Sequence, residues 1–432
     1  MDRNETTQLI IDDHERGIFR VNRRSFTDPA IFERERREIF DRSWLYVCHE
    51  SEIAKPGNFI TRKVGGRALL IARDTEGVVR AFFNACTHRG NIVCREKSGT
   101  ARAFMCFYHA WTFNQKGELM GVPGEDGYAP GFDRKELGLK EVPRFANYRG
   151  LMFACFDAEI VPLEDYLGNA REHLDAMIDF GGDQVEIVPG AQSYSMRANW
   201  KLLVENSMDG YHATSTHLRY FRQYMPDIGM DSSQWMNMNA WGDTDGLALD
   251  NGHAVLKTPM RPTPIAASAA AELAATRAKL DSKFGKERAH QIADYHRNIF
   301  IFPNLILISL WHTVRTFYPI APDYMEIDSW GLFPSNDSEV LRQKRFANFL
   351  SFLGPGGFAA PDDVSALEGC QKGFATQIEA WSDISRGMAR APQAIDEQQM
   401  RAFWRRWRAL MAGERGPTEC ADRRAESVVT AK

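Results

Sequence analysis

The sequence predicts an α+β protein in which a small all-β domain is inserted into a larger domain of helices and strands. From Trp44 to about Phe156, short apolar runs alternate with turn signals, as in "NFITRKVGGRALLIARDTEGVVRAFFNAC". This pattern is typical of antiparallel strands joined by tight turns. Before and after that stretch, apolar residues recur at helical spacing. The length of 432 residues accommodates two or three domains.

The N-terminal segment is predicted to end in an amphipathic helix over residues 29–43. Its sequence, "PAIFERERREIFDRS", places Ile31, Phe32, Ile39 and Phe40 between charged residues. Apolar side chains at this spacing form one face of a helix. We therefore expect residues 1–43 to pack on a larger body and the all-β domain to follow over residues 44–156.

After residue 156 the patterns predict a mixed domain over residues 157–412. Helices are predicted over 163–178, 199–217, 266–299, 338–353, 363–386 and 393–412, and strands over 185–198 and 299–334. In the apolar stretch "NIFIFPNLILISLWHTV", Pro303 and Asn304 separate two halves far shorter than the ~20 residues that span a bilayer. We expect two buried strands there, no membrane segment, and a disordered polar tail over 413–432.

Composition and charge exclude some classes of function. The net charge is −4 and no basic stripe is present, so no nucleic-acid partner is expected. The N-terminus, "MDRNETTQLIIDDHERG", lacks an apolar signal region, which predicts a cytoplasmic protein. Its seven cysteines are then expected to be reduced thiols.

Two short cysteine–histidine pairs lie inside the all-β domain, in "CTHRGNIVCREKSGTARAFMCFYHAWTF". They are Cys86 with His88, and Cys106 with His109. Two thiolates and two imidazoles suit a tetrahedral zinc site as well as an iron–sulfur site. Because each pair mixes the two residue types, the pattern favours the Rieske [2Fe–2S] arrangement, in which one iron binds both thiolates and the other binds both imidazoles. A zinc-stabilised binding module is the alternative.

A second motif, "NWKLLVENSMDGYHATSTH", covers residues 199–217. Asp209 and His212 are three residues apart and share one face of a helix, whereas His217, five residues after His212, does not. The helix must therefore end or bulge near Thr214 if both imidazoles are to converge. Two convergent histidines with a carboxylate form the facial triad of non-haem Fe(II) oxygenases. A histidine pair of this spacing is more often structural, and here it gains weight from the cluster motif.

The carboxylate must come from a distant part of the chain. In "GPGGFAAPDDVSALEGCQKG", a glycine- and proline-rich loop enters a helix with Asp362 and Asp363 in its first turn. Acidic residues at this position also stabilise a helix N-terminus. Spacing alone leaves both interpretations open.

Together these motifs resemble the large (α) subunit of the Rieske non-haem iron aromatic-ring-hydroxylating dioxygenases, from about residue 18 to about residue 412. The resemblance implies a Rieske domain inserted into a catalytic domain of the helix-grip type, an antiparallel sheet flanked by helices. It implies that one cluster iron is bound by Cys86 and Cys106 and the other by His88 and His109.

The resemblance also assigns roles around the mononuclear iron. The implied ligands are His212, His217 and Asp363, with Asn206 nearby as a non-ligand. Asp209 would connect His212 to His109 of the partner subunit. Ala360 and Pro361 stand where the family commonly has an acidic or amide residue, so the choice between Asp362 and Asp363 stays open.

Within the family, "FRVNRRSFT", "PGEDGYAP" and "LDNGHAV" resemble the p-cumate type, and other parts resemble the phthalate, terephthalate, benzoate and anthranilate types. A small aromatic carboxylate is the implied substrate. The candidate pocket residues are Met208, Val255, Leu256, Ile306, Ile308, Trp311, Arg315, Phe352 and Phe358. The guanidinium of Arg315 suits a carboxylate, although a structural salt bridge would explain it equally well.

The implied reaction adds both atoms of dioxygen to an aromatic ring and gives a cis-dihydrodiol. No G-x-G-x-x-G fingerprint follows a predicted strand, so electrons from NADH are expected through a separate flavin reductase, with or without a ferredoxin. The family resemblance implies a ring of three α subunits, often with three small β subunits. The rival hypotheses are a Rieske monooxygenase or demethylase and a Rieske electron carrier without catalysis.

Overall fold

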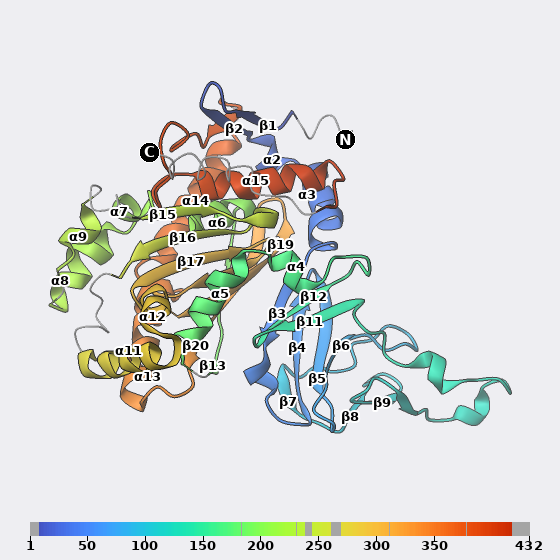
Figure 1. Ribbon diagram of the computed structural model, residues 1–432. Coiled ribbons are helices and arrows are strands. Elements are labelled where there is room, and N and C mark those ends of the chain that lie inside the picture. Colours follow the sequence, from blue (N-terminus) through green and yellow to red (C-terminus); the bar gives the residue numbers. More distant parts are fainter. Residues whose placement is uncertain are drawn as a thin grey trace. The chain divides into compact units, whose positions relative to one another are not determined.

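The computed structural model describes residues 8–182, 184–229, 231–237, 244–260, 269–310, 312–376 and 378–416. The chain forms two compact units, one of Phe40–Leu163 and one that joins Met1–Ile39 to Glu164–Lys432. Figure 1 shows the elements of both along the chain. The all-β unit is thus an insertion into the larger one, as the sequence predicts. Most of the predicted tail, from residue 417, lies outside the described residues.

The inserted unit contains small antiparallel sheets. They are formed by β3 (Leu45–His49), β11 (Arg144–Tyr148) and β12 (Leu151–Cys155); by β4 (Asn58–Val64), β5 (Arg67–Arg73), β6 (Val79–Phe83) and β7 (Ser98–Thr100); and by β8 (Ala103–Met105), β9 (Thr112–Asn114) and β10 (Leu119–Gly121). Gly65 and Gly66 turn β4 into β5 with φ angles of 55° and 78°, which a residue with a Cβ rarely adopts. Alternate strand residues such as Leu70, Phe82 and Phe113 form its core.

The larger unit is organised around one antiparallel sheet. Its strands are β13 (Val185–Ile187), β14 (Gln192–Met196), β15 (Asp245–Ala248), β16 (Ala254–Pro259), β17 (Tyr295–Ile301), β18 (Leu305–Ile308), β19 (Thr313–Ala321) and β20 (Tyr324–Pro334). The order is β13-β20-β19-β18-β17-β16-β15, and β14 also pairs with β20. The two strands predicted around Pro303 and Asn304 are β17 and β18, both largely buried.

Helices cover both faces of this sheet (Figure 1). The helices that follow the inserted unit along the chain are α4 (Leu163–Leu167), α5 (Ala170–Asp179), α6 (Trp200–Ser207), α7 (Ala213–Thr216), α8 (Met225–Asp227), α9 (Ser233–Met236), α11 (Ala270–Phe284), α12 (Lys286–Ala293), α13 (Glu339–Leu353), α14 (Ala360–Phe374) and α15 (Gln398–Met411). Because strand residues alternate between faces, Asn298 of β17 reaches Ser207 of α6, whereas Arg297 reaches Gln291 of α12. Helices α6 and α12 therefore lie on opposite faces, and the helix-grip arrangement is confirmed.

The N-terminal segment belongs to the larger unit. It contains β1 (Ile10–Asp13), β2 (Ile18–Asn22), α2 (Arg24–Thr27) and α3 (Pro29–Glu35), followed by a π-helical turn, η1 (Arg36–Phe40). Strand β2 pairs with β21 (Trp381–Asp383). The buried carboxylate of Glu35 accepts hydrogen bonds from Lys201 Nζ at 2.6 Å, Trp200 Nε1 at 2.8 Å and Trp407 Nε1 at 2.6 Å. One residue of α3 thus joins α6 to α15.

Several predicted helices have different limits; for example, 163–178 is divided into α4 and α5, and 393–412 begins only at Gln398. The segment 266–299 is divided at Gly285, whose φ is 80°, and helical structure stops before β17 begins at Tyr295. The segment 363–386 begins earlier, at Ala360, and ends at Phe374 before β21. The segment 199–217 is helical only to Ser207 and again over Ala213–Thr216. Among the residues described, no helix is long and apolar enough to cross a membrane.

Candidate metal centres and their cavity

The two cysteine–histidine pairs lie on loops of matching backbone geometry. In the first loop, the N–H of Gly90 donates to the carbonyl of Cys86 at 2.8 Å, and the N–H of Cys86 donates to Asn91 at 2.7 Å. The second loop repeats this pattern: the N–H of Ala110 donates to the carbonyl of Cys106 at 2.9 Å, and the N–H of Cys106 donates to the carbonyl of Trp111 at 2.8 Å. In each loop the fourth residue after the cysteine has positive φ: 78° at Gly90 and 56° at Ala110.

The side chains of these loops suit a two-iron cluster. The rings of His88 and His109 lie 4.6 Å apart, and His88 stacks on Trp111 at 4.7 Å. The buried Nδ1 of His88 has no hydrogen-bond partner among the described residues, so it is available to a metal. Among the described residues, the group of His, Cys, Asp or Glu donor atoms close enough to hold a single ion is found elsewhere, at His212, His217 and Asp363, and not between these loops. This disfavours a single zinc ion between the loops.

The thiol of Cys106 is prepared to ionise. Burial raises its pKa, but hydrogen bonds to its sulfur from the backbone N–H of Tyr108 and from the Asn91 amide outweigh burial and lower the pKa below that of an ordinary thiol. The Asn91 amide nitrogen lies 3.7 Å from that sulfur. A thiolate is the form that binds iron, so the donor set fits the cluster.

The second site begins where α6 ends. Asn199 caps the start of α6, accepting from the N–H of Lys201 at 3.1 Å. After Ser207 the chain leaves the helix, and the Met208 carbonyl accepts from Gln399 of α15 at 2.7 Å. A Cβ on Gly210 would lie 2.5 Å from the carbonyl oxygen of Ala394, so glycine permits this close approach. The break therefore comes at residues 208–212, earlier than the predicted break near Thr214.

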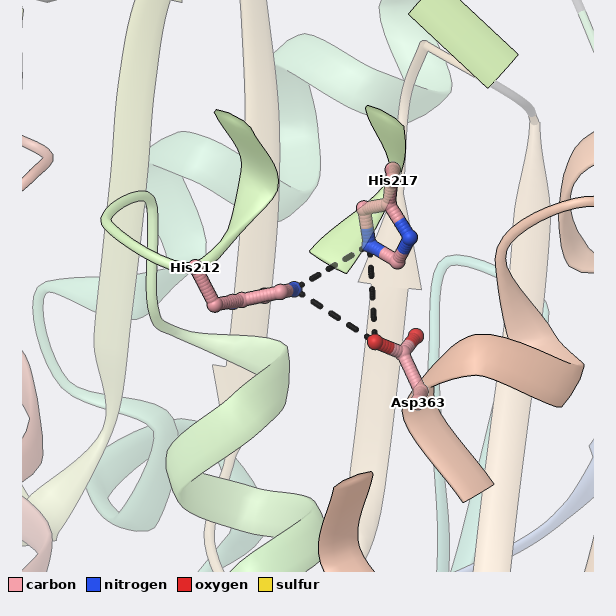
Figure 2. A group of neighbouring side chains, drawn as sticks. All are labelled: His212, His217 and Asp363. Carbon is pink, nitrogen blue, oxygen red and sulfur yellow. Dashed lines mark hydrogen bonds and ion pairs between the residues drawn. The ribbon is translucent and has the colours of Figure 1, made fainter. Parts of the chain in front are cut away.

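Three donor atoms converge after this break. The Nε2 atoms of His212 and His217 lie 3.2 Å apart, and Oδ1 of Asp363 in α14 lies 3.5 Å from the first and 3.4 Å from the second (Figure 2). Donors about 2.1 Å from one ion at right angles would be about 3.0 Å apart. The three observed separations are slightly wider, and they fit one face of an octahedral metal site.

The two neighbouring aspartates differ in their positions. Asp363 is nearly buried and faces both imidazoles (Figure 2). Asp362 lies instead 3.9 Å from Nδ1 of His217, on the other edge of the ring, and its side chain is 31% exposed. The first turn of α14 thus directs one carboxylate to each edge of His217.

Asp209 and Asn206 contact two of the three residues that carry these donor atoms, His212 and Asp363. Oδ2 of Asp209 lies 3.3 Å from Nδ1 of His212, and the Asn206 amide donates to Asp363 Oδ1 at 3.1 Å. Burial disfavours the imidazolium of His212, but the carboxylates of Asp209 and Asp363 outweigh burial and raise its pKa to about 10. The site therefore stabilises positive charge, as a divalent iron requires.

A cavity opens beside these donors. Its walls include Asn206, Tyr220, Leu256, Asn298, Ile308 and Arg315, together with Phe352 of α13. Leu256, Asn298 and Ile308 are paired in register across β16, β17 and β18, so their side chains share one face of the sheet. Sequence analysis missed Asn298 and Tyr220. The alternation of β17 could have indicated Asn298, whereas Tyr220 lies on a π-helical turn that has no clear sequence signal.

The other predicted pocket residues lie elsewhere. Met208 is buried at the end of α6. Ile306 is buried two residues before Ile308 on β18, and Val255 points to the opposite face of β16 from Leu256. Phe358 packs 6.2 Å from the ring of Tyr220, which lines the cavity in its place. Trp311 lies outside the described residues.

Arg315 is the cation of this cavity. It is 4% exposed, and no carboxylate lies within 4 Å of its guanidinium in the described part of the chain. Its Nη1 lies 3.5 Å from the hydroxyl of Tyr194, and its buried Nε has no partner among the residues described. An uncompensated buried cation is costly, and within the described ranges no structural salt bridge, the alternative considered above, compensates Arg315.

Family models match both parts of the chain that contain these residues. Residues 166–413 match the family Ring hydroxylating alpha subunit (catalytic domain), and residues 43–143 match the Rieske [2Fe-2S] domain. The 2-halobenzoate 1,2-dioxygenase large subunit of Burkholderia cepacia is 33% identical over 392 residues, which cover 88% of this chain and 83% of that protein. The toluate 1,2-dioxygenase subunit alpha of Pseudomonas putida is 33% identical over 404 residues, covering 90% and 86%.

Solved structures give the same result. Naphthalene 1,2-dioxygenase with indole bound in the active site has a TM-score of 0.85 and 28% identity, with 96% of each chain covered. The resemblance inferred from the motifs is confirmed, and the hypotheses of a zinc module and of a bare electron carrier are wrong. The cofactors of this family are a Rieske [2Fe–2S] cluster and a mononuclear iron. The chain therefore belongs to the ring-hydroxylating α-subunit family, as the terminal oxygenase subunit of an aromatic-ring-hydroxylating dioxygenase.

Proposed function

We propose that this oxygenase cis-dihydroxylates a small aromatic carboxylate and that Arg315 binds the carboxylate group of the substrate. The observation that carries the proposal is the buried guanidinium in the cavity beside His212, His217 and Asp363, which has no acidic partner among the described residues. A substrate carboxylate would compensate this charge and accept hydrogen bonds from the planar guanidinium. The substrates named for the two relatives, a halobenzoate and toluate, are aromatic carboxylates.

The cavity would also orient the ring. Leu256, Ile308 and Phe352 offer apolar contacts to a flat ring, while Arg315 would hold one end of it. A ring fixed at one end presents one edge to the three donors. Such fixed positioning accounts for a large part of enzymatic rate enhancement, and it would make dihydroxylation selective for one pair of carbon atoms.

We propose these residue roles. Iron would be held by His212, His217 and Asp363, and the cluster by Cys86, His88, Cys106 and His109. When bound, the iron supplies open positions for dioxygen and the cluster supplies electrons one at a time. Asn206 would hold Asp363 in place as a non-ligand, and Asp209 would fix the ring of His212 through Nδ1. Asp209 would also connect His212 to His109 of the partner subunit.

Members of this family take electrons from reductase or ferredoxin partners and form multimers. For this chain we propose NADH as the electron source, through a separate reductase, and a ring of three α subunits, with or without β subunits. Each turnover would consume two electrons, two protons and one dioxygen per ring. The cytoplasmic location expected from the N-terminus stays a prediction.

The experiment is paired kinetics of the wild type and Arg315→Met on benzoate and on toluene. Removing one partner of a buried charge pair costs roughly 3–5 kcal/mol, so kcat/KM for benzoate should fall by about two to four orders of magnitude. The value for toluene should change by less than about threefold, because toluene has no charge to compensate. Tyr194→Phe, which removes only the hydroxyl next to Arg315, is the matched control.

Two outcomes would contradict the proposal. If the wild type prefers toluene, the substrate is not an aromatic carboxylate. If the wild type prefers benzoate but Arg315→Met lowers both substrates equally, Arg315 supports the cavity wall and another group binds the carboxylate.

A further inference from the structure

A second cavity adjoins the catalytic one in the same unit. Its walls combine apolar side chains with arginines, among them Met177, Phe180, Leu280, Ile292, Arg297 and Arg345. The two cavities share His296 and Leu310 as lining residues. His296 stands near the start of β17, and Leu310 follows the end of β18. Continuing the register from Asn298 and Ile308 places these two residues opposite each other, so they form a common wall.

Arg297 gives the second cavity an uncompensated charge. It is 4% exposed, and its Nη1 and Nη2 donate to the backbone carbonyls of Tyr295 at 3.2 Å and Gln291 at 2.6 Å. Those two bonds hold the guanidinium in place, but carbonyls carry no net charge to cancel its own. Its buried Nε has no partner, and no carboxylate lies within 4 Å of it, within the ranges that the structure describes.

The other charged groups of this cavity are paired. Arg277 contacts Asp281 and Asp294, and Arg345 contacts Asp337 at 2.6 Å. Further charges lie around Arg297 without contacting it: burial and the charge of Arg297 lower the pKa of Lys257, while the carboxylate of Glu172 acts on both groups in the opposite direction. A surplus of buried positive charge next to apolar walls suits an anion with a flat apolar body.

We propose that this second cavity is an antechamber that binds a planar organic carboxylate through Arg297 and passes it to the catalytic cavity past the shared wall of His296 and Leu310. This inference rests on the proposed preference for aromatic carboxylates. The two unpaired guanidiniums, Arg297 and Arg315, would then be successive partners of one substrate carboxylate, so the charge would not have to cross the protein uncompensated.

Arg297→Gln tests the charge, because the amide can still donate hydrogen bonds to the carbonyls. KM for benzoate should rise about tenfold, equivalent to 1.4 kcal/mol, while kcat stays within about twofold. Toluene kinetics should not change, and Arg297→Lys should recover most of the loss. The control is Arg288→Gln, which removes a nearby charge paired with Asp179 outside both cavities. An equal rise in KM for benzoate and toluene would overturn the proposal.

Two further measurements separate this proposal from the proposed function. Calorimetric titration of the holoenzyme with benzoate, without reductant, should give two sites per chain in the wild type and one in Arg297→Gln. A single site in the wild type overturns the antechamber, whichever substrate is preferred in turnover. Leu310→Trp should lower kcat/KM for benzoate and toluene alike by narrowing the passage, and unchanged values for both would show that substrate enters elsewhere. A preference for toluene with two benzoate sites would overturn only the proposed function.

Discussion

The two candidate metal centres are assembled in different ways. The cysteine–histidine loops lie close together in the sequence, and each is closed by its own backbone hydrogen bonds. The three donors of the mononuclear site come from α14 and from a broken segment after α6, which a carbonyl contact at Gly210 and a hydrogen bond from Gln399 hold in place. The first centre depends on local geometry, and the second depends on long-range packing.

This difference determines how each centre should respond to substitution. A local loop tolerates changes elsewhere in the chain but not changes in its own ligands. A site built by packing is affected by residues that never contact the metal, because shifts of an ångström are sufficient to misalign reacting groups.

The largest expected effect is loss of a cluster ligand. Cys86→Ala should remove the visible absorption of the cluster and reduce iron from about three to about one per chain. The mononuclear site should keep its iron, because its ligands belong to the other unit. Absorption spectra and iron analysis check this, with Cys94→Ala as the control. Loss of all three irons would show that the centres are not independent.

The next effect separates the two neighbouring aspartates. Asp363→Ala should abolish turnover and leave the cluster spectrum intact, because it removes the carboxylate that faces both imidazoles. Asp362→Ala should lower activity by less than about tenfold, since that carboxylate faces only the far edge of His217. Steady-state turnover and a visible spectrum are measured on both. The reverse order of the two effects would assign the ligand to Asp362.

A smaller effect tests the long-range packing of the second centre. Lys201→Met would leave the buried Glu35 without its cation and should lower the free energy of unfolding of the larger unit by roughly 3–5 kcal/mol. Urea unfolding followed by tryptophan fluorescence reports it, because Trp200 and Trp407 both donate to Glu35. The double variant Glu35→Gln/Lys201→Met should recover part of the loss. Equal stability of single variant and wild type would contradict the role of this pair.

The smallest effect concerns the matched loops. Ala110 has positive φ without being glycine, so Ala110→Gly should stabilise the inserted unit by about 1 kcal/mol, and Gly90→Ala should destabilise it by a similar amount. No heavy atom lies within 4 Å of a Cβ built on Gly90, so its effect would be purely conformational. Thermal loss of cluster absorbance measures both. Effects of the same sign would show that the loops are not equivalent.

The sequence predicted the first centre better than the second for a physical reason. Cys86 and His88 lie within one short loop, and Cys106 and His109 lie within another. The spacing in the sequence is therefore enough to predict which residues come together. The break after α6 was expected near Thr214 because that prediction used only the helical spacing of His212 and His217. The real break depends on Ala394 and Gln399, which no local pattern connects to α6.

The same reason explains the pocket. Leu256, Ile308, Arg315 and Phe352 line the cavity, as expected from strand alternation and the resemblance to the family. Phe358 does not, and its ring packs instead near the rings of Tyr220 and Tyr224, of which Tyr220 lines the cavity. The split at Gly285 is local, because a glycine adopts the φ of 80° found there. The residues that follow the end of α14 include β21, which pairs with the distant β2, a contact that no local pattern predicts.

The contacts of Glu35 also constrain how the protein is made. Its hydrogen-bond partner Trp407 lies in α15, and the whole inserted unit is synthesised between the two. At about 5–20 residues per second, a ribosome needs roughly ten seconds or more to reach α15 after the inserted unit has emerged. During that time the inserted unit has its whole sequence and is free to fold and receive its cluster. Meanwhile Glu35, within the first 39 residues, can already meet Lys201 and Trp200 of α6 but not Trp407 of α15. The order of synthesis therefore favours cluster insertion before completion of the catalytic unit.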